Sequence, residues 1–199
     1  MKHLGYIKKE LMKLYGKKQT EVIIQFANEY YLELTSLCQN ASKGEWIHLE
    51  NTILHVTSFY KALLQVDREN ALNHTRKILI DLCETGGQVL DTFLKIPGMT
   101  SIFMMILPKM ATKMFGQECG FDYEHLQITK SSIQMDMTVC PYLKYARLFD
   151  ILELMPIFCE SDFATYGKLS KISFIRNETL GTGGNKCDFK FIKKQGGSL

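Results

Sequence analysis

Apolar residues recur at helical spacing through the first two-thirds of the chain. The first set is Leu4, Ile7, Leu11 and Leu14, and the second is Ile23, Phe26, Tyr30, Leu34 and Leu37. Because residues three and four apart share one face of an α-helix, these stretches predict amphipathic helices. Two further helices are expected at about residues 49–65 and 70–94, the second weakened in its middle by Gly86 and Gly87.

The period changes from about Leu126 onward. In SIQMDMTVC, residues 132–140, every second side chain is apolar, which is typical of a strand with one buried face. A helical period returns at residues 142–155, and two more strands are expected at 171–177 and 186–193.

Strands joined by short connections after a helical block predict an α+β fold, with the helical block packed on a small C-terminal antiparallel sheet. A chain of 199 residues is long enough for one domain with a real core. We therefore expect a single domain over 1–199, mainly helical in 1–118 and α+β in 119–194.

Charge and composition narrow the class of protein. The chain has 24 basic and 21 acidic residues, a balance that does not favour nucleic-acid binding. Its opening residues lack the apolar core of a secretory signal. The longest apolar stretch, residues 99–107, is far shorter than the ~20 residues of a membrane span. Six separated cysteines without an export signal indicate reduced thiols in a cytoplasm.

The glycine-rich stretch TLGTGGNKCDFKF, residues 179–191, does not match a phosphate-binding loop. Cys187 stands after Lys186, where such a loop needs a hydroxyl side chain, and a strand follows instead of a helix. The dinucleotide pattern fails because Lys186 occupies the place of its third glycine. The glycines are better explained as a hairpin turn that uses positive φ angles.

The cysteines do not form a recognisable metal motif. Zinc sites usually place cysteines in pairs two to four residues apart, whereas Cys140, Cys159 and Cys187 are isolated. A Cys-based metal-binding module stays open as an alternative if these three converge in space. Otherwise they are small buried thiols. We assign no metal and no cofactor.

Strand alternation constrains which side chains can act together. Cys187 lies on one face of its strand and Asp188 on the other, so the two cannot line one pocket unless a bulge intervenes. Arg176 shares an apolar strand face and needs an anionic partner there. That partner is either Asp136, Asp162 or the carboxylate of a substrate.

Cys159 and Asp162 are three residues apart and share a face if their segment is helical. A neighbouring carboxylate raises the pKa of a thiol, so a reactive Cys159 would need a cation such as Arg176 nearby. Alternatively, Asp162 is a general base or accepts a hydrogen bond from a substrate, and Cys159 only packs. His55, on the third helix, is a candidate for substrate binding, although a histidine in such a place is more often structural.

The order of several motifs resembles the L-2-amino-thiazoline-4-carboxylic acid hydrolase family of bacterial proteins. The matching features are Cys-Pro-Tyr at 140–142, Cys-x-x-Asp at 159–162, Arg-x-x-Thr-Leu at 176–180 and Gly-x-x-Cys-Asp-Phe-x-Phe at 184–191. The likeness runs from the third helix onward. This sequence departs from the family pattern at His55, Asn177 and Asn185-Lys186, which puts the substrate in doubt more than the fold.

The resemblance implies hydrolytic opening of a small cyclic amidine to carbamoyl-cysteine. Addition at the amidine carbon needs a base for water or a thiolate nucleophile, and an acid for the leaving nitrogen. The candidates for catalysis are Cys187, Cys159, Asp162 and Asp188, and those for substrate binding are Arg176, Cys140, Thr179 and His55.

The expected partner is a small-molecule substrate, with no nucleic acid and no membrane, and a homo-oligomer stays open. A non-catalytic small-ligand sensor is the main alternative, because a helical block on a small sheet also resembles vinyl-reductase-type binding domains.

Overall fold

The computed structural model describes residues 4–194 and contains two compact units. The first consists of Met1–Ala41 and Trp46–Leu79, and the second of Ser42–Glu45 and Ile80–Leu199. The expectation of a single domain stays a prediction.

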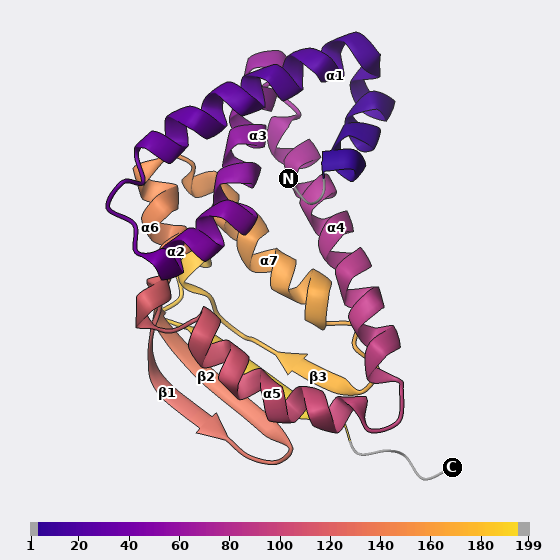
Figure 1. Ribbon diagram of the computed structural model, residues 1–199, viewed down its shortest axis with the longest axis vertical. Helices are drawn as coiled ribbons and strands as arrows, with labels where there is room; N and C mark the ends of the chain where they lie inside the picture. Colours follow the sequence, from indigo (N-terminus) through magenta and orange to yellow (C-terminus); the bar gives the residue numbers. More distant parts are fainter. Residues whose placement is uncertain (1–3, 195–199) are drawn as a thin grey trace. The chain divides into compact units, whose positions relative to one another are not determined.

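The first unit is helical (Figure 1). Its main elements are α1 (Leu4–Ser36), the end of α2 (Lys43–His48), a π-helical turn (Leu49–Ile53), α3 (Leu54–Val66) and the start of α4 (Ala71–Leu94). The two helices expected at the N-terminus form one element with a break at Gly16, whose φ of 71° lies in the left-handed region. Leu11, Ile23 and Leu63 are among its fully buried side chains.

The second unit contains the rest of α4, further helices and the sheet. The helices are α5 (Met99–Met114), α6 (Pro141–Leu148) and α7 (Met155–Tyr166), and short 3₁₀ turns lie at Gln117–Cys119, Leu152–Leu154 and Leu180–Thr182. The strands are β1 (Asp122–Ile128), β2 (Ser132–Val139), β3 (Ile172–Ile175) and β4 (Cys187–Lys193). Neighbouring strands are antiparallel in the order β1-β2-β4-β3, so the α+β prediction is confirmed.

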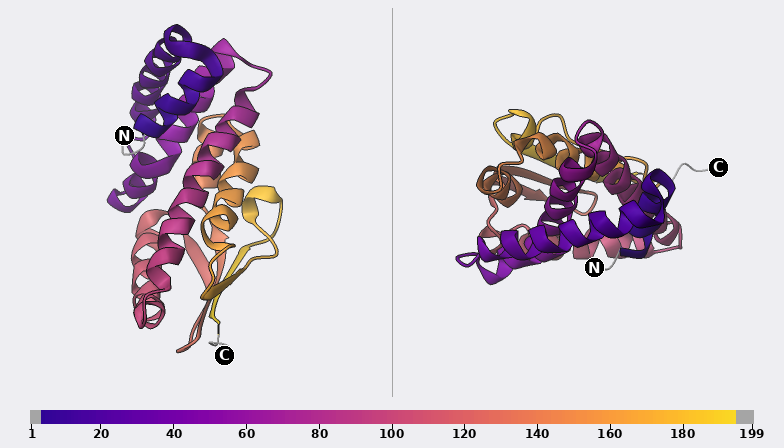
Figure 2. Two further views of the ribbon diagram at one scale, coloured as in Figure 1. Left: turned by 90° about the vertical axis from the view of Figure 1, so that its right-hand side faces the viewer. Right: turned by 90° about the horizontal axis from the view of Figure 1, so that it is seen from above.

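One face of the sheet carries the core of the second unit. Ile133, Met135 and Met137 alternate along β2 and are buried with Phe174 of β3 and Phe191 of β4. Helix α5 lies along the sheet (Figure 1; Figure 2, left) and adds Met104 and Ala111 to this core. Figure 1 also shows α7 beside the C-terminal end of β3.

None of the helices within the described residues is both long and apolar enough to cross a membrane.

Candidate active site

The antiparallel register brings three strand ends together. Met137 pairs with Cys187, so the end of β2 and the residue after it, Cys140, lie beside the beginning of β4. Strand β3 runs antiparallel to β4 on the other side, and Arg176 follows its last residue. Helix α7 contacts this end of β3 and the turn Leu180–Thr182. Residues far apart in the sequence therefore meet at one end of the sheet.

A partly buried ion pair ties α7 to the sheet. The Arg176 Nη1 atom donates to Asp162 Oδ2 at 2.5 Å, and its Nη2 atom donates to the carbonyl oxygen of Cys159 at 2.7 Å. The guanidinium lies over the ring of Phe163, with 4.8 Å between Cζ and the ring centroid. The side chain of Arg176 is only 4% exposed, whereas that of Asp162 is 33% exposed and so remains accessible from the surface. Of the partners that the sequence left open, the structure selects Asp162.

The other candidate partner, Asp136, is paired elsewhere. Its Oδ2 atom accepts a hydrogen bond from Lys186 Nζ at 2.8 Å. Asp136 lies on β2 opposite Asp188 of β4. Strand alternation puts both carboxylates on the face of the sheet away from Cys187 and the apolar core.

Three thiols gather near the Arg176–Asp162 pair. Leu180 N donates to the sulfur of Cys187 at 3.3 Å. The sulfur of Cys159 lies so close to Gly181 that a Cβ atom added there would be 2.7 Å away. Cys140 precedes the first turn of α6, and its thiol interacts electrostatically with those of Cys187 and Cys159. The three cysteines, whose convergence the sequence left open, therefore lie near one another.

Burial keeps these thiols protonated near neutral pH. It raises the pKa of Cys140 to about 12 and that of Cys187 to about 11, although nearby backbone N–H groups act in the opposite direction. Burial also raises the pKa of Cys159, against the lowering effects of the Thr179 hydroxyl and the Arg176 guanidinium. Any thiolate at this site must therefore form during a reaction.

Asp162 is the site group that titrates closest to neutral pH. Burial raises its pKa to about 6, and Arg176 opposes the shift. A carboxyl with such a pKa can accept a proton at pH 7 and return it later. Tyr166 and Cys83 interact with Asp162 from α7 and α4 and were not among the sequence candidates. Neither carries a sequence signal, because each occupies an ordinary helical position.

Asp188 stabilises the loop that follows β3 through hydrogen bonds to Asn177 and Glu178. Its Oδ1 atom accepts hydrogen bonds from the backbone N–H groups of Asn177 and Glu178, both at 2.8 Å, and its Oδ2 atom accepts one from Asn177 Nδ2. These contacts outweigh the raising effect of burial, so the pKa of Asp188 lies below its usual value. The contacts favour a structural role for Asp188 on the face away from the thiols.

The glycine-rich loop, residues 179–186, contacts two of the thiols, those of Cys159 and Cys187. Thr179 is 6% exposed, and its Oγ1 atom shares a hydrogen bond with Thr182 Oγ1 at 2.8 Å. The loop closes through a 3₁₀ turn, and only Gly183 has a positive φ, of 91°. Gly181 serves a different need, since it leaves room for the sulfur of Cys159. The sequence indicated the turn but not this contact.

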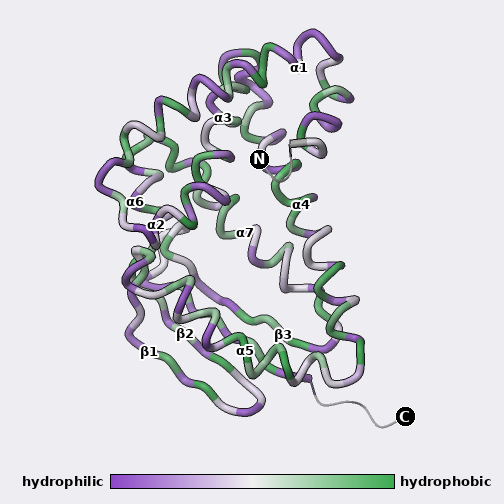
Figure 3. Tube along the Cα trace, viewed as in Figure 1, coloured by the Kyte–Doolittle hydropathy of each residue, from purple (hydrophilic) through white to green (hydrophobic). Residues whose placement is uncertain are grey.

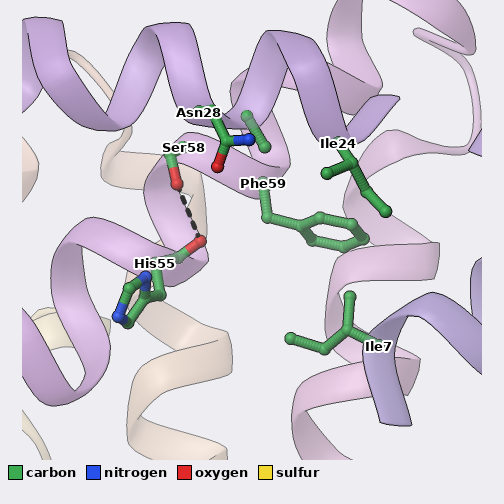
Figure 4. Close-up of a pocket in the computed structure, with 7 residues that line it drawn as sticks. Ile7, Ile24, Asn28, His55, Ser58 and Phe59 are labelled. Atoms are coloured by element: carbon green, nitrogen blue, oxygen red, sulfur yellow. Dashed lines mark hydrogen bonds between the residues drawn. The ribbon is translucent and has the colours of Figure 1, made fainter. Parts of the chain in front are cut away.

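His55 lies in the first unit. Figure 4 shows it on α3 at the edge of a small pocket, with Ser58 and Phe59 from the same helix and Ile7 and Ile24 from α1. The ring stacks on Tyr31 with 4.9 Å between centroids. Burial lowers the pKa of His55, so the imidazole is neutral at pH 7. Its role in substrate binding stays a prediction.

Within residues 4–194, no group of three or more His, Cys, Asp or Glu side chains is arranged to hold a metal ion.

Two comparisons with known proteins bear on this site. None of the curated proteins matches the chain significantly. The model of the L-2-amino-thiazoline-4-carboxylic acid hydrolase family matches residues 46–191, which include all of the site residues described above. The chain belongs to the L-2-amino-thiazoline-4-carboxylic acid hydrolase family.

Proposed function

We propose that the protein is a hydrolase that opens a small cyclic amidine of the 2-aminothiazoline-4-carboxylate type, giving carbamoyl-cysteine. The observation that supports this most is Asp162, a carboxyl whose pKa is raised to about 6, which is bound to Arg176 and interacts with the thiols of Cys159 and Cys187. The family to which the chain belongs bears the name of this reaction.

Asp162 is the general base of the proposed reaction. The carboxylate takes a proton from water as the water oxygen bonds to the amidine carbon between sulfur and nitrogen. The resulting tetrahedral adduct collapses to a C=O bond as the bond from that carbon to the ring nitrogen breaks. Asp162 passes this first proton to the ring nitrogen as the adduct forms. On collapse it takes the proton of the adduct's hydroxyl group and passes it to the same nitrogen, which leaves as an amine, so the net change is the addition of one water molecule.

Arg176 is a positioning residue in this proposal. Its guanidinium binds both the Asp162 carboxylate and the Cys159 carbonyl oxygen, and stacks on Phe163. A guanidinium with these contacts orients the base and has little capacity left for the carboxylate of a substrate. The two thiols have two alternative roles. Either Cys159 or Cys187 attacks the amidine carbon after losing its proton to Asp162, or both only shape the site.

The test measures loss of 2-aminothiazoline-4-carboxylate by mass spectrometry for wild type, Asp162→Asn, Cys159→Ser and Cys187→Ser. Cys119→Ser is the matched control, because Cys119 is also a buried thiol of the second unit but hydrogen-bonds to Lys113 O on α5. We expect turnover by wild type and Cys119→Ser, and a loss of about 100-fold or more in Asp162→Asn with its fold retained.

The serine variants separate the two roles of the thiols. A loss in Cys187→Ser or Cys159→Ser as large as that in Asp162→Asn identifies the nucleophile, whereas retained turnover assigns the attack to water. Full turnover by all three site variants would contradict the site assignment. Absence of turnover by wild type would move the proposal to another cyclic substrate or to a ligand sensor.

A further inference from the structure

Several large apolar side chains are exposed to solvent near the turn that connects α4 to α5. Along α4, Val89 and Phe93 point outward, and Ile96 follows in the turn. These residues are spaced by four and three, so they form one stripe. Val89 is 68% exposed and Ile96 is 53% exposed.

Helix α5 has two apolar faces. Met104 and Ala111 lie on the face that packs in the core of the second unit. Ile102, Met105 and Ile106 lie on the outward face, and Met105 is 67% exposed. We call the six outward side chains of both helices the α4–α5 corner: Val89, Phe93, Ile96, Ile102, Met105 and Ile106. Figure 3 shows the hydrophobic stretches at the end of α4 and along α5 on either side of their connecting turn.

The charged side chains around the corner are mainly positive. Helix α5 contains Lys109 and Lys113 and no acidic residue. Lys193 Nζ donates to Ser101 Oγ at 2.8 Å, which adds a third cation beside the first turn of α5. The nearest acidic residue in the sequence, Asp91, is already bound to Lys95 Nζ at 2.7 Å and to Ser170 N.

Against the expectation from the sequence that no membrane is a partner, we propose that the α4–α5 corner docks on an anionic phospholipid bilayer surface. An exposed apolar patch accompanied by lysines is the combination that binds at the interface of a membrane, where apolar side chains enter the acyl boundary and lysines contact phosphate groups. A second copy of the chain fits less well, because two such corners would bring lysines together without carboxylates to pair them. Docking is independent of the proposed hydrolase activity.

Sedimentation with lipid vesicles tests the docking. The full-length protein is mixed with vesicles of phosphatidylcholine alone or of phosphatidylcholine with phosphatidylglycerol, at low and at high salt. We expect binding to the phosphatidylglycerol vesicles that weakens as salt is added. The double variant Met105→Gln/Ile106→Gln should bind at least about tenfold more weakly than wild type. The double variant Lys109→Gln/Lys113→Gln should lose most of the salt dependence of binding, since only Lys193 remains of the three cations.

Leu32→Gln is the matched control, because Leu32 is an exposed apolar side chain of α1 at 71% exposure, outside the corner. It should bind like wild type. Absence of wild-type binding to phosphatidylglycerol vesicles at low salt would overturn the proposal. The proposal would also be overturned if light scattering showed a wild-type dimer that Met105→Gln/Ile106→Gln converts to a monomer. In that case a second copy of the chain covers the corner.

Discussion

The residue that links the geometry of the site to its chemistry is Asp162. Its carboxyl has a pKa of about 6 because burial disfavours the charged form more than Arg176 favours it. Since a base must be deprotonated to act, kcat/KM should be constant above pH 7 and fall about tenfold per pH unit below pH 6. Steady-state rates from pH 5 to pH 8 check this. A profile without a break near pH 6 would exclude Asp162 as the base.

Gly181 makes a second residue-scale prediction. A Cβ atom at this position would lie 2.7 Å from the sulfur of Cys159 and 2.8 Å from Cε of Met155. Gly181→Ala should therefore destabilise the protein by about 1–3 kcal/mol through overpacking, as measured by chemical denaturation.

The variant Cys159→Ala tests the cause. This variant removes the sulfur atom. In the Cys159→Ala background, Gly181→Ala should therefore lower the free energy of unfolding by less than it does in wild type, with a difference of about 0.5 kcal/mol or more. Equal costs in both backgrounds would mean that the Cys159 contact does not limit this position.

At the scale of elements, Gly86 and Gly87 differ although both lie inside α4. A Cβ atom on Gly87 would lie 2.4 Å from the carbonyl oxygen of Thr165, so α4 approaches the end of α7 closely there. A Cβ atom on Gly86 would meet nothing within 4 Å.

Gly86→Ala should therefore stabilise the protein by about 0.5–1 kcal/mol through helix propensity. Gly87→Ala should destabilise it by about 1–3 kcal/mol, because backbone atoms cannot yield as a flexible side chain does. Thermal unfolding of the two single variants compares them directly. A stabilising Gly87→Ala would show that the two helices separate without cost.

The sequence predicted best those elements in which apolar residues recur with a clear helical or strand period. The strand expected at 132–140 is β2, Ser132–Val139, and the helix expected at 70–94 is α4, Ala71–Leu94. Strand β1 was not predicted, because DYEHLQI has no clean alternation and is a strand through its pairing with β2. The helix expected at 142–155 is wrong in its extent: α6 ends at Leu148, and Asp150 follows with a φ of 53°.

At the scale of the whole molecule, long-range register positions the site. The sequence showed that Cys187 and Asp188 lie on opposite strand faces and that Arg176 needs an anion, since both follow from local rules. It did not show that Gly181 contacts Cys159 or that Leu180 N binds the sulfur of Cys187. Those contacts depend on how β2, β3, β4 and α7 meet, which no local pattern encodes.

The clustering of buried thiols also affects the stability of the whole protein at alkaline pH. The pKa values of Cys140 and Cys187 rise from 9.0 to about 12 and about 11. Between pH 9 and these values, the folded protein retains thiol protons that the unfolded chain has released. The unfolded state then binds fewer protons, so the free energy of unfolding falls as pH rises.

At pH 10 each of the two thiols should lower the free energy of unfolding by about 1 kcal/mol relative to pH 7. Urea denaturation at pH 7, 8, 9 and 10 measures this loss. Because lysines and tyrosines also begin to titrate at pH 10, the informative quantity is the difference between wild type and Cys140→Ala. The variant lacks one buried thiol, so its stability should decline less between pH 8 and pH 10, even if it is less stable at pH 7. Parallel declines would mean that the Cys140 thiol ionises as readily in the folded protein as in the unfolded chain, and that burial does not protect it.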